Sequence, residues 1–198
     1  GTNGAAVTPT SSGGDSDDFS GYNHYGPDTV YDTTQKMHGA VSAKATAVKG
    51  TERYYTFWTA PPYLRKVLIT AYFKASDNLA VGSYDNPSYA AQFLSYNSSG
   101  LSYLTNKNVY LHNQLLGTIL ADTWYRFELY VHTITGTWKA KYYLGDSTTP
   151  IGSLEVTTAP VWNISSEVRV GHAGGFTAGN YWIDSVQVFG DRDTFGNP

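Results

Sequence analysis

Two neighbouring segments, residues 123–132 and 137–144, alternate apolar and polar side chains on either side of a short polar turn. Such alternation is typical of β-strands that bury one face. The turn ends in Gly136, a residue suited to the left-handed backbone of a tight hairpin. If Val131 pairs with Trp138, the odd-numbered residues of the first segment and the even-numbered residues of the second share one apolar face. The pattern therefore predicts a β-hairpin in a defined register.

This register assigns every side chain of the hairpin to one of two faces. On the apolar face it pairs Leu129 with Ala140, Phe127 with Tyr142 and Tyr125 with Leu144. On the other face it pairs Tyr130 with Lys139, Glu128 with Lys141 and Arg126 with Tyr143. A slip of one residue would expose the apolar set to water, so we expect a fixed register and an ion pair between Glu128 and Lys141.

Short β-rich segments separated by turn signals make up the rest of the chain. The other candidate strands are residues 39–48, 51–59, 66–75, 89–96, 101–105, 108–112, 152–158, 167–171 and 180–189. No segment carries a sustained helical stripe, and residues 21–32 read as a loop. Because 41% of the 198 residues are hydrophobic, the chain can bury a substantial core. We therefore predict an all-β fold, a two-sheet antiparallel sandwich.

Residues 1–17 are small and polar, with Val7 as the single larger apolar side chain. We expect this segment to be a flexible linker, followed by one domain over residues 18–198. The net charge is −3 and no stretch gathers Lys and Arg, which argues against nucleic acid as a partner. No apolar run approaches the ~20 residues that span a bilayer, so we expect no membrane insertion. The chain has no Cys and hence no disulfide.

Four segments carry a resemblance to a known family. They are residues 122–131, 135–144, 167–171 and 181–188. Together they resemble the second half of concanavalin A-like lectin/glucanase (laminin G-like) domains, and they look most like those near the ends of tail proteins of bacteriophages of actinobacteria. The resemblance covers roughly residues 64–198. It implies a jelly-roll sandwich whose terminal strands lie side by side, in an extracellular or virion-associated protein. Glycan binding is the commonest use of that fold, and some branches are hydrolases or lyases.

The sequence does not favour an enzyme. Glycosidases need two carboxylates across the scissile bond, and the glucanase branch supplies them from one strand as Glu-x-Asp-x-(x)-Glu. The four glutamates of this chain, Glu52, Glu128, Glu155 and Glu167, have no such partner. Residues 72–75 resemble a short motif of the alginate lyases of this fold. The other motifs of that branch, an Arg-rich strand that contains Glu and a Gln-x-His, are missing from this sequence. A polysaccharide-cleaving enzyme of the same fold stays open as an alternative.

Aspartates gather near both ends of the predicted domain. Because the resemblance brings the terminal strands together, Asp18 and Asp184 are candidate ligands for a structural Ca²⁺, although no cofactor is required for binding. Asp184 is the more suggestive of the two, since it interrupts an apolar strand and needs partners if it is buried. The alternative is a β-bulge that turns Asp184 to solvent or onto backbone N–H groups.

Glycan recognition requires flat aromatic rings that pack against the apolar faces of sugars, with planar polar groups around them that bond to the sugar hydroxyls. The candidate ligand-binding residues are Tyr72, Gln92, Arg126, Glu128, Tyr130, Lys139 and Tyr143, with Tyr84, Tyr89, Tyr103 and Trp162 as loop candidates. We expect a non-catalytic module that binds a glycan, a cell-surface polysaccharide or a receptor. The alternative use of such a tyrosine-rich face is packing between copies in a homo-oligomer, for example a trimer that decorates a fibre.

Overall fold

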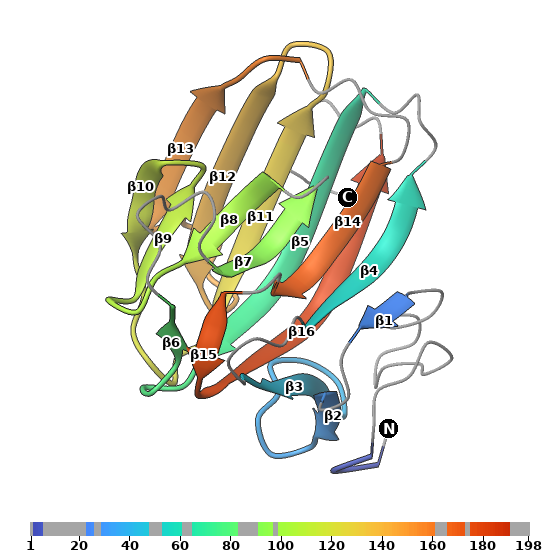
Figure 1. Cartoon of the computed structure of the whole chain (residues 1–198), viewed down its shortest axis with the longest axis vertical. Helices are drawn as coiled ribbons and strands as arrows, with labels where there is room; N and C mark the ends of the chain where they lie inside the picture. Colours follow the sequence, from blue (N-terminus) through green and yellow to red (C-terminus); the bar gives the residue numbers. More distant parts are fainter. Residues whose placement is uncertain are drawn as a thin grey trace.

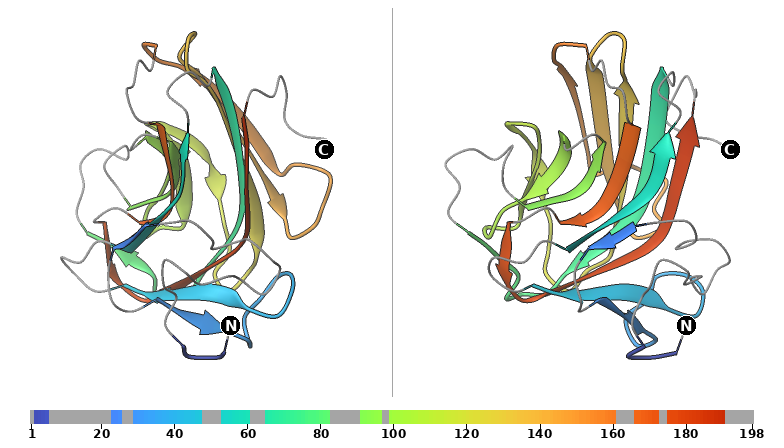
Figure 2. Two further views of the ribbon diagram at one scale, coloured as in Figure 1. Left: turned by 90° about the vertical axis from the view of Figure 1, so that its right-hand side faces the viewer. Right: turned by 45° about the vertical axis from the view of Figure 1, so that its right-hand side comes forward.

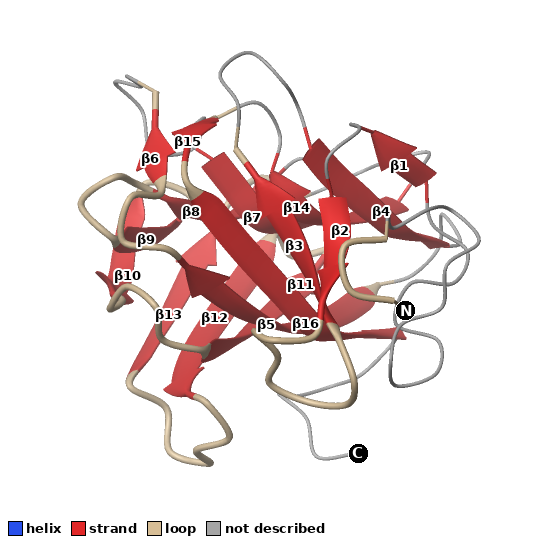
Figure 3. Ribbon diagram, turned by 90° about the horizontal axis from the view of Figure 1, so that it is seen from below, coloured by secondary structure: helices blue, strands red, loops and turns tan. Residues whose placement is uncertain are grey.

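The chain folds into two facing β-sheets, as shown by a computed structural model that describes residues 2–5, 23–25, 29–47, 53–60, 65–82, 91–96, 99–160, 166–172 and 175–190 (Figures 1 and 2). Within these ranges no residue is helical, so no helix there could span a membrane (Figure 3). All strand pairs among the described residues are antiparallel. The predicted all-β, two-sheet architecture is confirmed.

Each of the two large sheets has seven strands. Sheet A runs β13 (Gly152–Thr157), β12 (Thr137–Leu144), β11 (Tyr125–His132), β5 (Lys66–Ala75), β16 (Asn180–Gly190), β3 (Ser42–Thr46) and β2 (Thr29–Asp32). Sheet B runs β1 (Asn23–Tyr25), β4 (Arg53–Ala60), β14 (Ser166–His172), β7 (Ala91–Tyr96), β8 (Ser99–Tyr103), β9 (Asn108–Leu111) and β10 (Gln114–Thr118). A small third sheet pairs β15 (Phe176–Ala178) with β6 (Ala80–Val81).

The β11–β12 hairpin has the register that its alternation predicts, with Val131 opposite Trp138 and Phe127 opposite Tyr142. Gly136 adopts a φ of 67°, in the left-handed region. A side chain at this position would also collide with the backbone carbonyl groups of Thr158 and Ala159. The turn therefore requires glycine for its conformation and for the space around it.

An aromatic cluster joins the two sheets across the core. Phe73 of sheet A stacks on Phe93 of sheet B with ring centroids 4.4 Å apart, and Phe127 meets Phe93 edge-on at 4.9 Å. All three rings are buried, as are the other odd-numbered residues of β11. Burial of this continuous apolar layer is the main stabilising contribution to the sandwich.

The strand predictions hold best where alternation is regular and fail at short edge strands. Residues 66–75 and 137–144 form strands with the predicted bounds. The loop predicted over residues 21–32 is wrong, because β1 and β2 form there. β2 exists through its pairing with β3, a long-range contact that a four-residue segment does not announce in its own pattern.

The start of the chain contacts sheet A. The N–H of Gly4 donates to the carbonyl of Tyr31, and the N–H of Tyr31 donates to the carbonyl of Ala5. Asn3 accepts a hydrogen bond from the N–H of Thr33 through its side chain, at 3.0 Å. The rest of the predicted linker, residue 1 and residues 6–17, lies outside the described residues.

We expect His112 to make the stability of the fold pH-dependent. Its Nε2 is buried without a hydrogen-bond partner, and its ring lies edge-on to Trp138 with centroids 4.8 Å apart. Burial lowers the pKa of His112 below its ordinary value, so the folded protein holds the imidazole neutral. The unfolded chain binds the proton more readily, and stability is therefore lost as the pH falls below about 6.5.

We expect the His112→Asn variant, which tolerates the positive φ of this position, to lose less stability on acidification than the wild type. Urea unfolding of both proteins at about pH 7.5 and about pH 5 measures the difference, since the pH interval brackets the ordinary pKa of histidine. Equal losses in both proteins would show that other groups set the acid sensitivity.

Candidate functional site

Six of the seven predicted ligand-binding residues lie on the outer face of sheet A, the face turned away from the core. They are Tyr72 on β5, Arg126, Glu128 and Tyr130 on β11, and Lys139 and Tyr143 on β12. The expectation that this face is open is wrong for four of them. Tyr72, Glu128, Tyr130 and Tyr143 are between 5% and 9% exposed.

Turn 144–151 covers part of the outer face of sheet A, through contacts with Arg126 and Tyr72. Arg126 donates from its guanidinium to the carbonyl of Ser147 at 3.2 Å. The guanidinium also lies over the ring of Tyr143, 4.2 Å from the ring centroid, and its Nε is 3.6 Å from the Glu128 carboxylate. Tyr143 in turn donates its hydroxyl to Glu128 at 2.9 Å. Arg126, Glu128 and Tyr143 therefore contact one another on this face, although the buried Nε of Arg126 has no hydrogen-bond partner.

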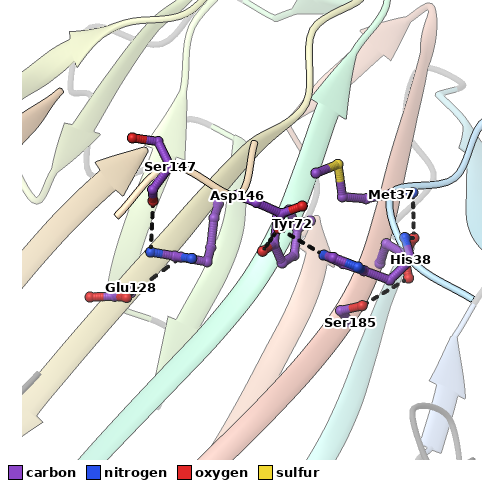
Figure 4. Close-up of polar contacts among 9 residues, drawn as sticks. Met37, His38, Tyr72, Glu128, Asp146, Ser147 and Ser185 are labelled. Carbon is purple, nitrogen blue, oxygen red and sulfur yellow. Dashed lines mark hydrogen bonds and ion pairs between the residues drawn. The ribbon is translucent and has the colours of Figure 1, made fainter. Parts of the chain in front are cut away.

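Tyr72 connects this cluster to a second loop, residues 33–41. Its hydroxyl donates to Asp146 Oδ1 at 2.6 Å, and His38 Nε2 lies 3.0 Å from the same oxygen (Figure 4). Burial and the Asp146 carboxylate raise the pKa of Tyr72 to about 12, so the phenol stays protonated as the donor. The hydrogen bond from Tyr72 lowers the pKa of Asp146. The two loops therefore meet over the outer face of sheet A.

The ion pair predicted between Glu128 and Lys141 stays a prediction. Glu128 lies opposite Lys141 in the register, as predicted, and the contacts described above join its carboxylate to Tyr143 and Arg126. Lys139 forms an ion pair with Glu155 of β13 at 2.9 Å. The side chains of Lys139 and Glu155 are 37% and 56% exposed, so this ion pair is screened by solvent and contributes little to stability.

Asp184 is buried at a β-bulge, where the pairing of β16 with β5 shifts its register. One carboxylate oxygen accepts the backbone N–H groups of Met37 at 2.7 Å and His38 at 3.0 Å, and the other lies 3.3 Å from the hydroxyl of Ser185 (Figure 4). Burial raises the pKa of Asp184, against the opposing effect of these hydrogen bonds. These contacts match the bulge alternative, since they satisfy the carboxylate without a cation.

The calcium site stays a prediction. Its other candidate ligand, Asp18, lies outside the described residues. Within the described ranges, no three Asp, Glu or His side chains come close enough together to hold a metal ion.

A second buried aspartate, which the sequence interpretation missed, anchors the same loop from its other end. Asp32 accepts hydrogen bonds from the backbone N–H groups of Thr34 and Gln35 and from the indole of Trp182, the last at 2.9 Å. Burial opposes ionisation, but these donors together lower the pKa of Asp32. An aspartate followed by two threonines is a typical local turn signal and could have indicated this anchor.

Gln92, the seventh predicted residue, is not part of this cluster. It lies on β7 in sheet B, directly opposite Ser102, which in turn lies opposite Tyr110. Tyr110 lies opposite Leu115 of β10. Because the flanking residues of β8 and β9 point into the core, these four side chains form one row across the outer face of sheet B. We call them the sheet B row.

The sheet B row is more accessible than the cluster on sheet A. Gln92 and Tyr110 are half-buried, and Leu115 is 52% exposed. The hydroxyl of Tyr110 lies 3.5 Å from Nδ2 of Asn108 on the same strand, at the outer distance limit of a hydrogen bond. Asn108 itself accepts a hydrogen bond of 2.6 Å from the hydroxyl of Thr118.

Among the loop candidates, Tyr103 was assigned to the wrong environment. It lies in β8, is fully buried, and packs in the core against Phe73 and Phe176. Alternation with Leu101 and Ser102 could have placed it there. The other loop candidates, Tyr84, Tyr89 and Trp162, lie outside the described residues.

The arrangement of two antiparallel sheets, with β16 paired to β3 from the early part of the chain, is that of a concanavalin A-like jelly roll. The first described strand, β1, lies in the other sheet, beside β4. A β-glucanase catalytic domain of glycoside hydrolase family 131 from Podospora anserina is similar, with a TM-score of 0.61, 14% identity, and coverage of 84% of this chain and 82% of that chain. The corresponding domain from Coprinopsis cinerea gives a TM-score of 0.57 and 13% identity, over 85% of this chain and 82% of that chain.

More distant similarity extends to the luminal domain of VIP36, solved with Ca²⁺ and a mannose disaccharide, at a TM-score of 0.47, 12% identity, and coverage of 97% of this chain and 89% of that chain. No protein-family model and no curated protein matches the sequence. The similarity thus defines the fold.

Proposed function

We propose that this protein is a non-catalytic carbohydrate-binding or receptor-binding domain of a phage tail or another extracellular assembly. The observation that carries the proposal is the half-buried ring of Tyr110, which lies directly opposite the exposed side chain of Leu115 on sheet B. It suits the apolar face of a sugar ring, and the amide of Gln92 at the other end of the row suits sugar hydroxyls.

The position of the row supports a glycan ligand. Neighbouring strands lie about 4.8 Å apart, so a row across four strands spans about 14 Å. That length accommodates a short oligosaccharide lying across the strands. The similar domains are a β-glucanase catalytic domain and the catalytic domain of another family 131 glycoside hydrolase, so the fold is compatible with a polysaccharide on one of its faces.

The composition of the row favours binding over hydrolysis. The sequences of β7, β8, β9 and β10 contain no Asp or Glu. A glycosidase mechanism needs two carboxylates at a defined separation, and these four strands supply none. A ligand on the sheet B row would therefore meet amide, hydroxyl, phenol and aliphatic groups.

We expect Tyr110→Ala to weaken binding to a retained polysaccharide by about tenfold, because it removes the ring against which the sugar packs. Tyr110→Phe keeps the ring and should retain most of the affinity. Affinity electrophoresis against a polysaccharide panel provides the measurement, with Lys139→Ala as the control on the opposite sheet.

Three outcomes of this experiment are informative. Equal retention of the wild type and Tyr110→Ala would contradict the proposed site. Release of oligosaccharides during the assay, detected by chromatography, would identify an enzyme instead. Retention of the wild type by no polysaccharide, together with a stable oligomer in light scattering, would favour the structural role in a fibre.

A further inference from the structure

Ser102 lies in the middle of the sheet B row, between Gln92 and Tyr110. Its side chain is fully buried, and its hydroxyl has no hydrogen-bond partner. A buried hydroxyl without a partner costs free energy in the folded state, and such groups are rare in native proteins. The Ser102 hydroxyl is one of a few such groups in the described part of the chain, and it is the one that lies within the sheet B row.

The surroundings of Ser102 allow a ligand to supply the missing partner. Gln92 and Tyr110 are its direct cross-strand neighbours, and both are half-buried rather than sealed. Side chains of directly opposed residues stand about 5 Å apart, so Gln92 and Tyr110 flank the serine on either side. Changes of side-chain rotamer on binding are common, and a movement of either neighbour would open a path to the hydroxyl.

The four strands that carry the row also indicate the charge of the ligand. β7, β8, β9 and β10 contain no Asp, Glu, Lys or Arg. A sugar carboxylate or sulfate placed on them would lose water without gaining an opposite charge from these strands, and would depend on Arg169 of the adjoining β14, opposite Ser95, for a cation. The hydroxyls of an uncharged sugar, by contrast, match the hydroxyl, amide and phenol groups of the row.

We infer that Ser102 is a specificity-determining residue whose hydroxyl bonds to a hydroxyl group of an uncharged glycan bound on the sheet B row. This inference rests on the proposed function and adds to it the class of ligand and the group that selects it. In the free protein the hydroxyl remains unpaired, so the site gives up stability that the bound glycan restores.

Ser102→Ala tests the inference because it separates stability from binding. Alanine removes the unpaired hydroxyl, so we expect the thermal midpoint to rise by roughly 2–4 °C. We expect the same variant to bind a neutral polysaccharide at least about fivefold more weakly, because a ligand hydroxyl loses its partner. Ser153→Ala, which changes an exposed serine on sheet A, should alter neither quantity.

The possible results distinguish this inference from the proposed function. Binding by the wild type that Tyr110→Ala weakens and Ser102→Ala leaves unchanged would overturn the role of Ser102 alone. Retention by acidic polysaccharides and by no neutral one would overturn the ligand class. A wild type that binds no glycan would overturn the proposed function and this inference together.

Discussion

Replacing Phe127 by alanine should lower the free energy of unfolding by about 3–5 kcal/mol, the range for truncation of a buried aromatic side chain. Phe127 is fully buried at the centre of β11. Its ring meets Phe93 of the opposite sheet at 4.9 Å and stacks on Tyr142 of the neighbouring strand at 5.9 Å. The substitution would leave a cavity where the two sheets contact each other, and rigid strands on both sides would limit its collapse.

Urea unfolding followed by tyrosine and tryptophan fluorescence measures this loss. Lys139→Ala is the matched control, because it changes a partly exposed side chain on the same hairpin. We expect the control to change the free energy of unfolding by less than about 0.5 kcal/mol. A comparably small effect of Phe127→Ala would show that the two faces of the hairpin are assigned the wrong way round.

Replacing Asp184 by alanine should lower the free energy of unfolding by about 2–3 kcal/mol, because it leaves two part-buried backbone N–H groups without their acceptor. The N–H groups of Met37 and His38 donate to this carboxylate, and through them loop 33–41 is fixed on sheet A. The variant should also lose local stability in loop 33–41. Limited proteolysis should cleave the variant within this loop faster than the wild type.

Asp184→Asn provides the matched variant for this prediction. Asparagine keeps one acceptor oxygen at the same position, so it should lose less stability than alanine. A chelator tests the alternative role of Asp184. If removal of calcium lowered the thermal midpoint of the wild type and left that of Asp184→Ala unchanged, the carboxylate would act as a metal ligand rather than as a loop anchor.

The alternation of residues 125–144 was sufficient to predict a hairpin and its register, because burial of one face fixes which residues oppose each other. It could not predict whether the outer face is open. That depends on contacts between residues distant in sequence, such as Tyr72 with Asp146 and Asp184 with the backbone of His38. Local patterns contain no information on which loop folds over which strand.

The sheet B row illustrates the same limit. The alternation of Leu101, Ser102 and Tyr103 could have indicated which side chain of that segment points outward. The row itself exists only because β8 pairs with β7 on one side and β9 on the other. Gln92 was therefore predicted as a ligand-binding residue but grouped with residues of the wrong sheet. Strand pairing across the sandwich, rather than residue type, decides which polar groups meet.

Hydrogen–deuterium exchange with and without a retained oligosaccharide tests the location of the glycan site most directly. We predict that the ligand protects the segments of β7, β8, β9 and β10 that carry Gln92, Ser102, Tyr110 and Leu115. Segments 33–41 and 144–151, which cover the outer face of sheet A, should exchange as in the free protein. Protection confined to these two loops, with β8 and β9 unchanged, would contradict the assignment of the binding face to sheet B.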